Sequence, residues 1–206
     1  MVCWMILVCL FIYSMMGMKK KSVSVKNINM NKEDAFIRTY TGGKVYFFNP
    51  ERSDIDPLDI FHPLALLCRF NGASRAPYSI AQHSVLVADE VFKETGDKSL
   101  AWQALAHDWS EAFISDVPSP FKQFFDGFKE MEVRMEEWLS KKFNFQYPFD
   151  PIIKHHDLRS LSTEMRDLMV VADNKDLPEP YPEKIVPLSW VKAQILISRK
   201  FHEYKP

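Results

Sequence analysis

From Asp56 to the C-terminus, the chain is a series of segments with the apolar spacing and the capping residues of α-helices. Asp56-Pro57 and Asp150-Pro151 each place a capping aspartate before a proline, an arrangement typical of a helix start. Between these starts and the glycine or proline stops, apolar side chains recur at the spacing of a buried helix face. We therefore predict helices over about 56–70, 80–94, 97–113, 127–143, 150–172 and from 189 onward.

One β-hairpin is predicted ahead of these helices. Residues 36–49 alternate apolar and polar side chains around Thr41-Gly42-Gly43-Lys44, whose glycines suit a tight turn. The chain has 6 glycines against 16 phenylalanines, which disfavours a glycine-punctuated β-barrel. The expected fold class is all-α, a bundle of roughly five to six helices with a small N-terminal β-hairpin at its edge.

Composition and charge exclude several classes of function. The 26 basic and 27 acidic residues leave a net charge of −1, so no nucleic-acid polymer is expected as a partner. The sequence contains neither the glycine-rich fingerprint of dinucleotide-binding folds nor a P-loop. The cysteines Cys3, Cys9 and Cys68 form no disulfide framework, which indicates a reducing compartment and a cytoplasmic location.

The apolar and basic composition of the N-terminal segment sets it apart from the rest of the chain. We therefore predict two parts, an N-terminal extension over residues 1–30 and a domain over residues 31–206. Residues 1–18 are almost all apolar and precede three lysines, the reverse of the order in a secretory signal. Three interpretations stay open: a dispensable extension ahead of a later start, a membrane anchor with the domain on the cytoplasmic side, and a secretory signal. The first is the one that we expect, and with it no membrane association.

Four residues with metal-ligand chemistry lie on the predicted helices: His83, the adjacent pair His107 and Asp108, and Asp157. A histidine and an aspartate on apolar helices are costly to bury unless a partner satisfies them. A divalent cation would satisfy both, since it binds imidazole nitrogen and carboxylate oxygen. From spacing alone, a core histidine, a structural His–Asp hydrogen bond and a solvated aspartate remain alternatives. Glu111, four residues after His107, is expected on the same helix face.

These residues resemble the H…HD…D signature of HD-domain metal-dependent phosphohydrolases. Within that superfamily, the chain is similar to the bacterial 5′-deoxynucleotidase branch and to phage dATP triphosphohydrolases. The resemblance covers roughly residues 37–172. It is carried by four ordered blocks: Cys68-Arg69-Phe70, Tyr78-Ser79-Ile80-Ala81-Gln82-His83-Ser84, His107-Asp108-Trp109-Ser110-Glu111-Ala112 and Ser115-Asp116-Val117-Pro118-Ser119-Pro120-Phe121-Lys122.

The resemblance implies a role for each matching position. The metal ligands would be His83, His107, Asp108 and Asp157. The ion would be divalent, and cobalt, manganese, magnesium and zinc all suit this donor set. The catalytic pair would be Glu111 and Asp116, and the substrate contacts would be Arg69, Phe70 and Lys122. Phe70 departs from the tryptophan that relatives often carry there, which puts stacking on the base in doubt.

The expected function is hydrolysis of a deoxynucleoside 5′-monophosphate to nucleoside and phosphate. One alternative is a deoxynucleoside triphosphate triphosphohydrolase, for which Arg75, Lys122 and Lys154 are available to the outer phosphates. Two others are a non-enzymatic nucleotide-sensing helical module and a membrane-tethered hydrolase of signalling nucleotides. A small-molecule deoxynucleotide is the expected partner, and a homo-oligomer is the expected assembly.

Overall fold

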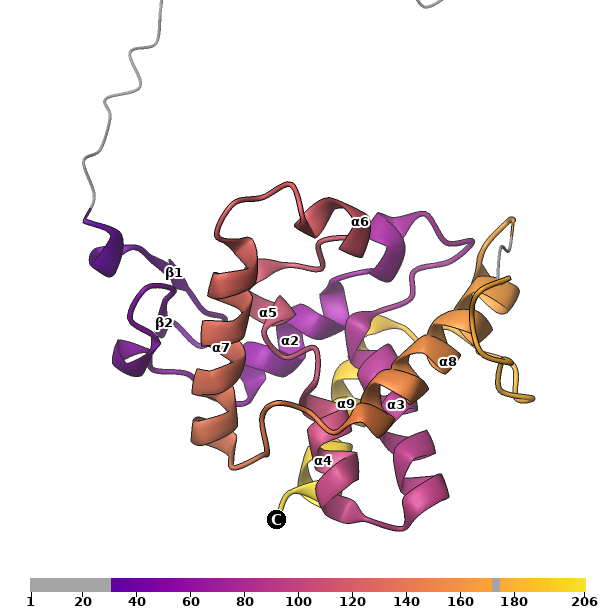
Figure 1. The fold of residues 1–206 in the computed structure, drawn as a ribbon. Helices are drawn as coiled ribbons and strands as arrows, with labels where there is room; N and C mark the ends of the chain where they lie inside the picture. The colour runs from indigo at the N-terminus through magenta and orange to yellow at the C-terminus, as the bar shows by residue number, and fades with distance from the viewer. Residues whose placement is uncertain (1–30, 172–174) are drawn as a thin grey trace, which may run out of the picture. The chain divides into compact units, whose positions relative to one another are not determined.

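The computed structural model describes residues 31–171 and 175–206, so the expectations for residues 1–30 lie outside the described part of the chain. Within it, no helix combines the length and the apolar character needed to cross a bilayer. Helices dominate, and one two-stranded sheet stands at the N-terminal side (Figure 1). The elements are β1 Phe36–Arg38, β2 Lys44–Tyr46, α2 Leu58–Leu66, α3 Ile80–Thr95, α4 Lys98–Ala106, α5 Glu111–Ile114, α6 Ser119–Lys122, α7 Phe128–Phe143, α8 Pro151–Leu168 and α9 Trp190–Tyr204.

The predicted hairpin is confirmed. β1 and β2 pair antiparallel, with Ile37 opposite Val45 in the register. Gly42 takes the positive φ that the turn requires, at +95°. The turn is held to the start of α2 by the buried Asp59, whose carboxylate accepts from the Thr41 backbone N–H at 2.7 Å and from the Thr41 hydroxyl at 2.8 Å. The hairpin is therefore fastened to the helical domain by a polar contact that the alternation pattern did not indicate.

The all-α expectation is confirmed as well, with the core lying between α2, α3, α4 and α9. Helix α9 packs against the other three, and α8 lies against α3 (Figure 1). The fully buried Trp109 stands in an aromatic cluster, with its ring centroid 5.2 Å from those of Trp102 and Phe143 and 6.0 Å from that of Phe201. Because Trp109 follows directly after His107 and Asp108, this cluster anchors the segment that carries two of the four predicted metal ligands.

The helix predicted over 97–113 is interrupted at this segment. Helix α4 ends at Ala106, residues 107–110 form turns, and α5 begins at Glu111. The His107 imidazole donates to the Ala104 carbonyl at 2.7 Å, the oxygen that the Asp108 N–H would use in a continued helix. The next backbone bonds are of the tighter 3₁₀ kind, with the Glu111 N–H donating to the Asp108 carbonyl at 3.1 Å. His107 and Glu111 therefore do not share the face of one regular helix.

Two other predicted helices end earlier than their patterns indicated. The first, α2, ends at Leu66, and a 3₁₀ turn over Arg69–Gly72 follows. In that turn Phe70 has a φ of 57°, the left-handed region that an L-residue adopts at a cost. Helix α8 ends at Leu168 rather than near 172. Arg69 therefore lies outside α2, and its side chain reaches Glu164 of α8.

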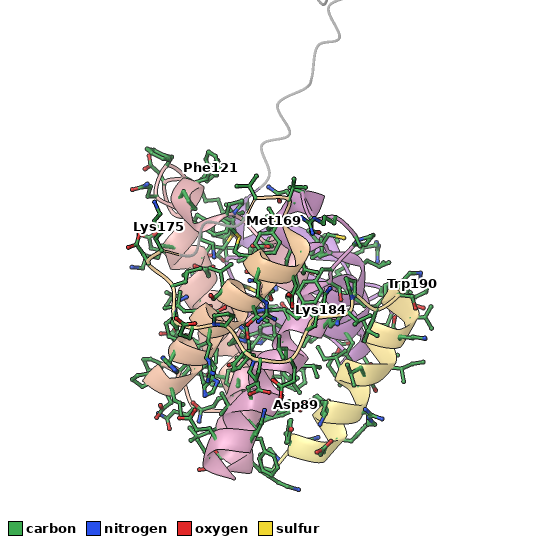
Figure 2. The ribbon with its side chains drawn as sticks, turned by 90° about the vertical axis from the view of Figure 1, so that its right-hand side faces the viewer. Asp89, Phe121, Met169, Lys175, Lys184 and Trp190 are labelled. Atoms are coloured by element: carbon green, nitrogen blue, oxygen red, sulfur yellow. The ribbon has the colours of Figure 1, made fainter. Side chains whose placement is uncertain are left out.

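The segment after α8 is tied back to that helix by charged hydrogen bonds. Figure 2 shows this segment, marked by Lys184, passing across the front of the domain. Both carboxylate oxygens of Asp167 accept from the Arg166 guanidinium, at 2.8 and 2.9 Å, and one also accepts from the Ile185 backbone N–H at 2.8 Å. The bonds from Arg166 and Ile185 hold the pKa of Asp167 below its ordinary value.

We expect Asp167→Asn to lower the free energy of unfolding by about 1–3 kcal/mol, because hydrogen bonds to a charged group contribute roughly that much. The folded pKa is lowered, so this stabilisation should be complete above the ordinary aspartate pKa of about 3.9 and lost as the pH falls through the folded value. Urea unfolding of both proteins at about pH 7 and about pH 3 measures the difference. An equal difference at the two pH values would contradict the assignment.

Candidate metal and phosphate site

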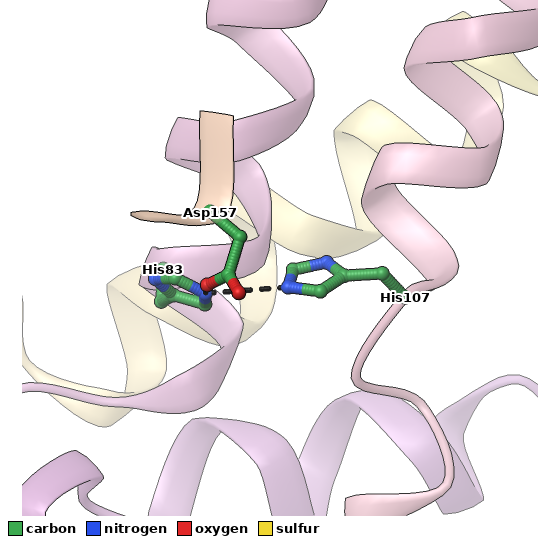
Figure 3. A group of neighbouring side chains, drawn as sticks. All are labelled: His83, His107 and Asp157. Atoms are coloured by element: carbon green, nitrogen blue, oxygen red, sulfur yellow. Dashed lines mark hydrogen bonds and ion pairs between the residues drawn. The ribbon is translucent and has the colours of Figure 1, made fainter. Parts of the chain in front are cut away.

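Three of the predicted metal ligands converge from three different helices. His83 comes from α3, His107 from the end of α4 and Asp157 from α8 (Figure 3). One ligand atom from each lies within 4.8 Å of the other two. The His83 Nε2 atom is 3.3 Å from the His107 Nε2 atom and 3.3 Å from an Asp157 carboxylate oxygen. This group could hold a metal ion.

The hydrogen bonds on the far side of each imidazole indicate which nitrogen faces the centre. The His83 Nδ1 atom donates to the Glu164 carboxylate at 2.6 Å, and the His107 Nδ1 atom donates to the Ala104 carbonyl at 2.7 Å. In the neutral rings both Nε2 atoms then carry lone pairs, which point at each other and at the Asp157 carboxylate. Three electron-pair donors that face one another at this distance repel unless a proton or a metal cation lies between them. The donor set therefore fits a divalent ion.

Asp108 lies beside this group. One of its oxygens is 3.3 Å from the His107 Nε2 atom and the other is 3.5 Å from the His83 Nε2 atom. Asp108 is not a member of the mutually close group of three, and it also lies 3.7 Å from the Arg69 guanidinium. Its position next to both imidazoles keeps it a candidate fourth ligand.

Sequence reasoning missed one residue of the site, Glu164. It is completely buried, and besides His83 it accepts from the Arg69 Nε at 2.9 Å. Burial alone would raise the pKa of this carboxyl, but Arg69 and His83 hold it below its ordinary value. Glu164 follows Asp157 by two helical turns, so the two residues share a face of α8. That spacing was the available signal.

A cavity of about 570 Å³ opens beside the metal group, and most of the predicted site residues line it. A second cavity of about 240 Å³ adjoins it, shares several of its walls and is also lined by His107, Glu132 and Glu136. His83 lies buried beneath, in contact with Asp108 and Asp157. The predicted residues on the wall of the larger cavity are Arg69, Phe70, Asp108, Glu111, Asp116, Lys122 and Asp157.

Glu111 and Asp116 are the carboxyl groups of this wall that have no predicted metal role. Burial, together with the nearby Asp108 and Asp116 charges, raises the pKa of Glu111 to about 9. Burial also raises the pKa of Asp116, and Asp108 adds to the effect. The Oε2 atom of Glu111 is buried without a hydrogen-bond partner among the described residues. A buried carboxyl with a perturbed pKa on a cavity wall is typical of a group that handles protons.

The basic residues differ in what they can reach. Arg69 and Lys122 line the larger cavity, and Lys122 is paired with Glu132 at 2.6 Å. Lys154 lines the cavity as well and is paired with Asp157 at 2.7 Å. Arg75 is exposed and does not line it. Of the three residues considered for outer phosphates, the structure therefore brings two to the cavity, each with a carboxylate partner.

Comparison with known sequences identifies the family. The sequence profile described as "5'-deoxynucleotidase YfbR-like" matches residues 76–177, the stretch that holds His83, His107, Asp108 and Asp157. "Uncharacterized protein YfdR" of Escherichia coli (strain K12) is 35% identical over 134 residues, which cover 65% of this chain and 72% of that protein. The chain belongs to the YfbR-like family of HD-domain proteins.

A second relative is more distant. An uncharacterized protein of Rhodobacter capsulatus is 30% identical over 114 residues, which cover 53% of this chain and 58% of that protein. Both relatives are bacterial, and they lend no support to the phage side of the resemblance. Membership in the YfbR-like family implies an HD-domain hydrolase acting on a small nucleotide, whereas the role of each site residue remains a prediction.

Proposed function

We propose that this YfbR-like protein hydrolyses deoxynucleoside 5′-monophosphates to nucleoside and phosphate, with a divalent ion held by His83, His107, Asp108 and Asp157. The observation that carries the proposal is a His–His–Asp group that lies beside a cavity whose wall includes Asp157 and the largely buried Arg69. The cavity volume of about 570 Å³ lies in the range of small-molecule sites.

The residues of the cavity wall divide the chemistry between them. A bound divalent ion would lower the pKa of water toward neutrality and polarise a phosphoryl oxygen. Arg69 grips phosphate oxygens through its terminal nitrogens, as a planar guanidinium does best. Glu111 moves a proton at the water or at the leaving 5′ oxygen, and Asp116 lies beside it on the wall. Lys122 adds positive charge near the phosphate.

The charge of the cavity supports one phosphate rather than three. Each basic side chain on the wall of the larger cavity already has a carboxylate partner, in the pairs Arg69–Glu164, Lys122–Glu132 and Lys154–Asp157, at 2.9, 2.6 and 2.7 Å. The acidic residues of the wall add further negative charge. A bound divalent ion then supplies most of the uncompensated positive charge. That balance suits a phosphate monoester better than the more highly charged tail of a triphosphate.

A deoxynucleoside triphosphate triphosphohydrolase is the second candidate, and the observation in its favour is that Lys122 and Lys154 do line the cavity. The two candidates differ in their product. A nucleotide panel assayed for phosphate and for triphosphate release, with manganese, cobalt, magnesium and zinc in turn, separates them.

We expect phosphate release from deoxynucleoside 5′-monophosphates to exceed all other activities on that panel, and chelator to abolish it. Triphosphate release as the main activity would favour the second candidate. Full activity in excess chelator would contradict metal dependence for both candidate functions.

The expected homo-oligomer is tested separately, by measuring the molar mass of the same protein in solution by light scattering.

A further inference from the structure

Glu164 lies in the interior of the domain, between the metal group and the cavity wall. Its side chain is completely buried on α8 and faces α3, which packs against that helix. An ionised carboxylate without partners is very costly at such a position. A glutamate at this buried position must therefore have contacts that compensate its charge.

The two carboxylate oxygens have different partners. Oε1 accepts from the His83 Nδ1 at 2.6 Å, and Oε2 accepts from the Arg69 Nε at 2.9 Å. His83 is a predicted metal ligand and Arg69 is the predicted phosphate-binding residue. One buried carboxylate thus contacts both a predicted metal ligand and the predicted phosphate-binding residue.

The contact with His83 determines how this ring can bind an ion. Because Nδ1 carries the proton that Glu164 accepts, Nε2 is the nitrogen left for an ion, and it is aimed at His107 and Asp157. The bond also prevents rotation of the ring and raises the basicity of Nε2. A carboxylate in this position on a metal-binding histidine commonly strengthens metal binding.

The contact with Arg69 determines where the guanidinium points. The guanidinium is planar, so a bond at Nε fixes the direction of the two terminal nitrogens. One of them, Nη1, lies 3.7 Å from Asp108, and the Arg69 side chain lines the cavity. Without Glu164 the arginine could turn toward Asp108 and be lost to the phosphate.

We propose that Glu164 is a positioning residue that holds His83 for the metal and Arg69 for the phosphate at the same time, so that metal binding and phosphate binding depend on one buried carboxylate. The proposal rests on the proposed function. It adds a residue that touches neither the metal nor the substrate and acts through two residues that do.

Glu164→Gln is the variant that tests it. A glutamine has the same shape, but its amide has one acceptor oxygen, so it satisfies either His83 or Arg69 and presents an N–H group to the other. We expect Mn²⁺ to bind the chelator-treated variant about 10–100-fold more weakly than the parent, by calorimetry. Inorganic phosphate should also bind the Mn²⁺-loaded variant more weakly than the loaded parent.

Asp167→Asn is the matched control, because it makes the same chemical change on the same helix at a residue that pairs with Arg166 and Ile185. It should lower stability and leave the Mn²⁺ and phosphate affinities at the parent values. A folded Glu164→Gln protein with parent affinities for both would overturn the proposal. So would equal losses in the two variants, since that pattern indicates a purely structural role.

A second measurement needs no variant. In the ¹⁵N-labelled, metal-free parent, long-range imidazole couplings report the tautomer of His83. A neutral ring with its proton on Nδ1 supports the proposal, and a neutral ring with its proton on Nε2 overturns it. A parent that binds Mn²⁺ and phosphate in a Glu164-dependent way, yet hydrolyses no nucleotide, would reject the proposed function and support the role of Glu164.

Discussion

His107→Ala and Asp108→Ala should each abolish nucleotide hydrolysis and strip bound metal from the protein. His107 contributes one of the nitrogen atoms of the metal group, and the Asp108 oxygens lie within 3.5 Å of both imidazoles. Changes to residues that only support a metal ligand cost about 10–100-fold in affinity or activity, so the loss of a ligand should exceed that range. The measurements are metal content by elemental analysis and phosphate release under saturating substrate.

His202→Ala is the control for this pair, since His202 is an exposed histidine of α9 outside both cavities. It should keep the parent's activity and metal content. Circular dichroism establishes that each variant is folded. A folded His107→Ala protein with its metal and activity intact would refute the metal assignment, and with it the proposed mechanism.

Glu111→Gln should lower kcat by about 10²–10⁴, the usual contribution of a general acid–base group, while metal content and substrate affinity stay near the parent values. Glutamine keeps the size and hydrogen-bonding reach of the side chain but cannot transfer a proton. Glu111 lines both cavities and is buried next to Asp108 without being in the metal group. Steady-state kinetics together with metal stoichiometry measures the effect.

Glu136→Gln is the matched control. Burial also raises the pKa of Glu136, to about 7, but this residue lines only the smaller cavity. Its variant should retain kcat within a small factor. Loss of metal from Glu111→Gln would make Glu111 a ligand, and an unchanged kcat would leave it as a buried carboxyl without a catalytic role.

The sequence by itself determined which stretches are helical, the position of the hairpin and the family, but not where three of the helices end. Ser79, Asp97 and Asp150 cap α3, α4 and α8 through their side chains, as their positions before the apolar runs predict. Gly96 closes α3 with a φ of +67°, which a glycine adopts without strain. Caps, turns and apolar spacing depend on residues a few positions away, so they can be predicted from the linear sequence.

The set of candidate metal residues was also present in the linear motifs, and the structure brings three of its four members into one close group. The motifs could not show which side chain each of these residues contacts in the folded protein. The sequence indicates no partner for the positive charge of Lys122, whereas in the structure its ammonium group is paired with the Glu132 carboxylate at 2.6 Å. That pairing changes the charge available to a substrate, and it depends on how the segment around α6 lies against α7.

The end of α4 at Ala106 comes from a local contact that the apolar pattern did not indicate, in which the His107 side chain takes the Ala104 carbonyl from the helix ladder. Only the tertiary structure decided the surroundings of Glu164, which lies 81 residues from His83 and 95 residues from Arg69 along the chain. A glutamate on an amphipathic helix is ordinarily solvated, and the shared helix face with Asp157 does not by itself show that this one is buried. Its role follows from the packing of α8 on α3, which brings a buried carboxylate into contact with a buried imidazole and with a guanidinium on the cavity wall.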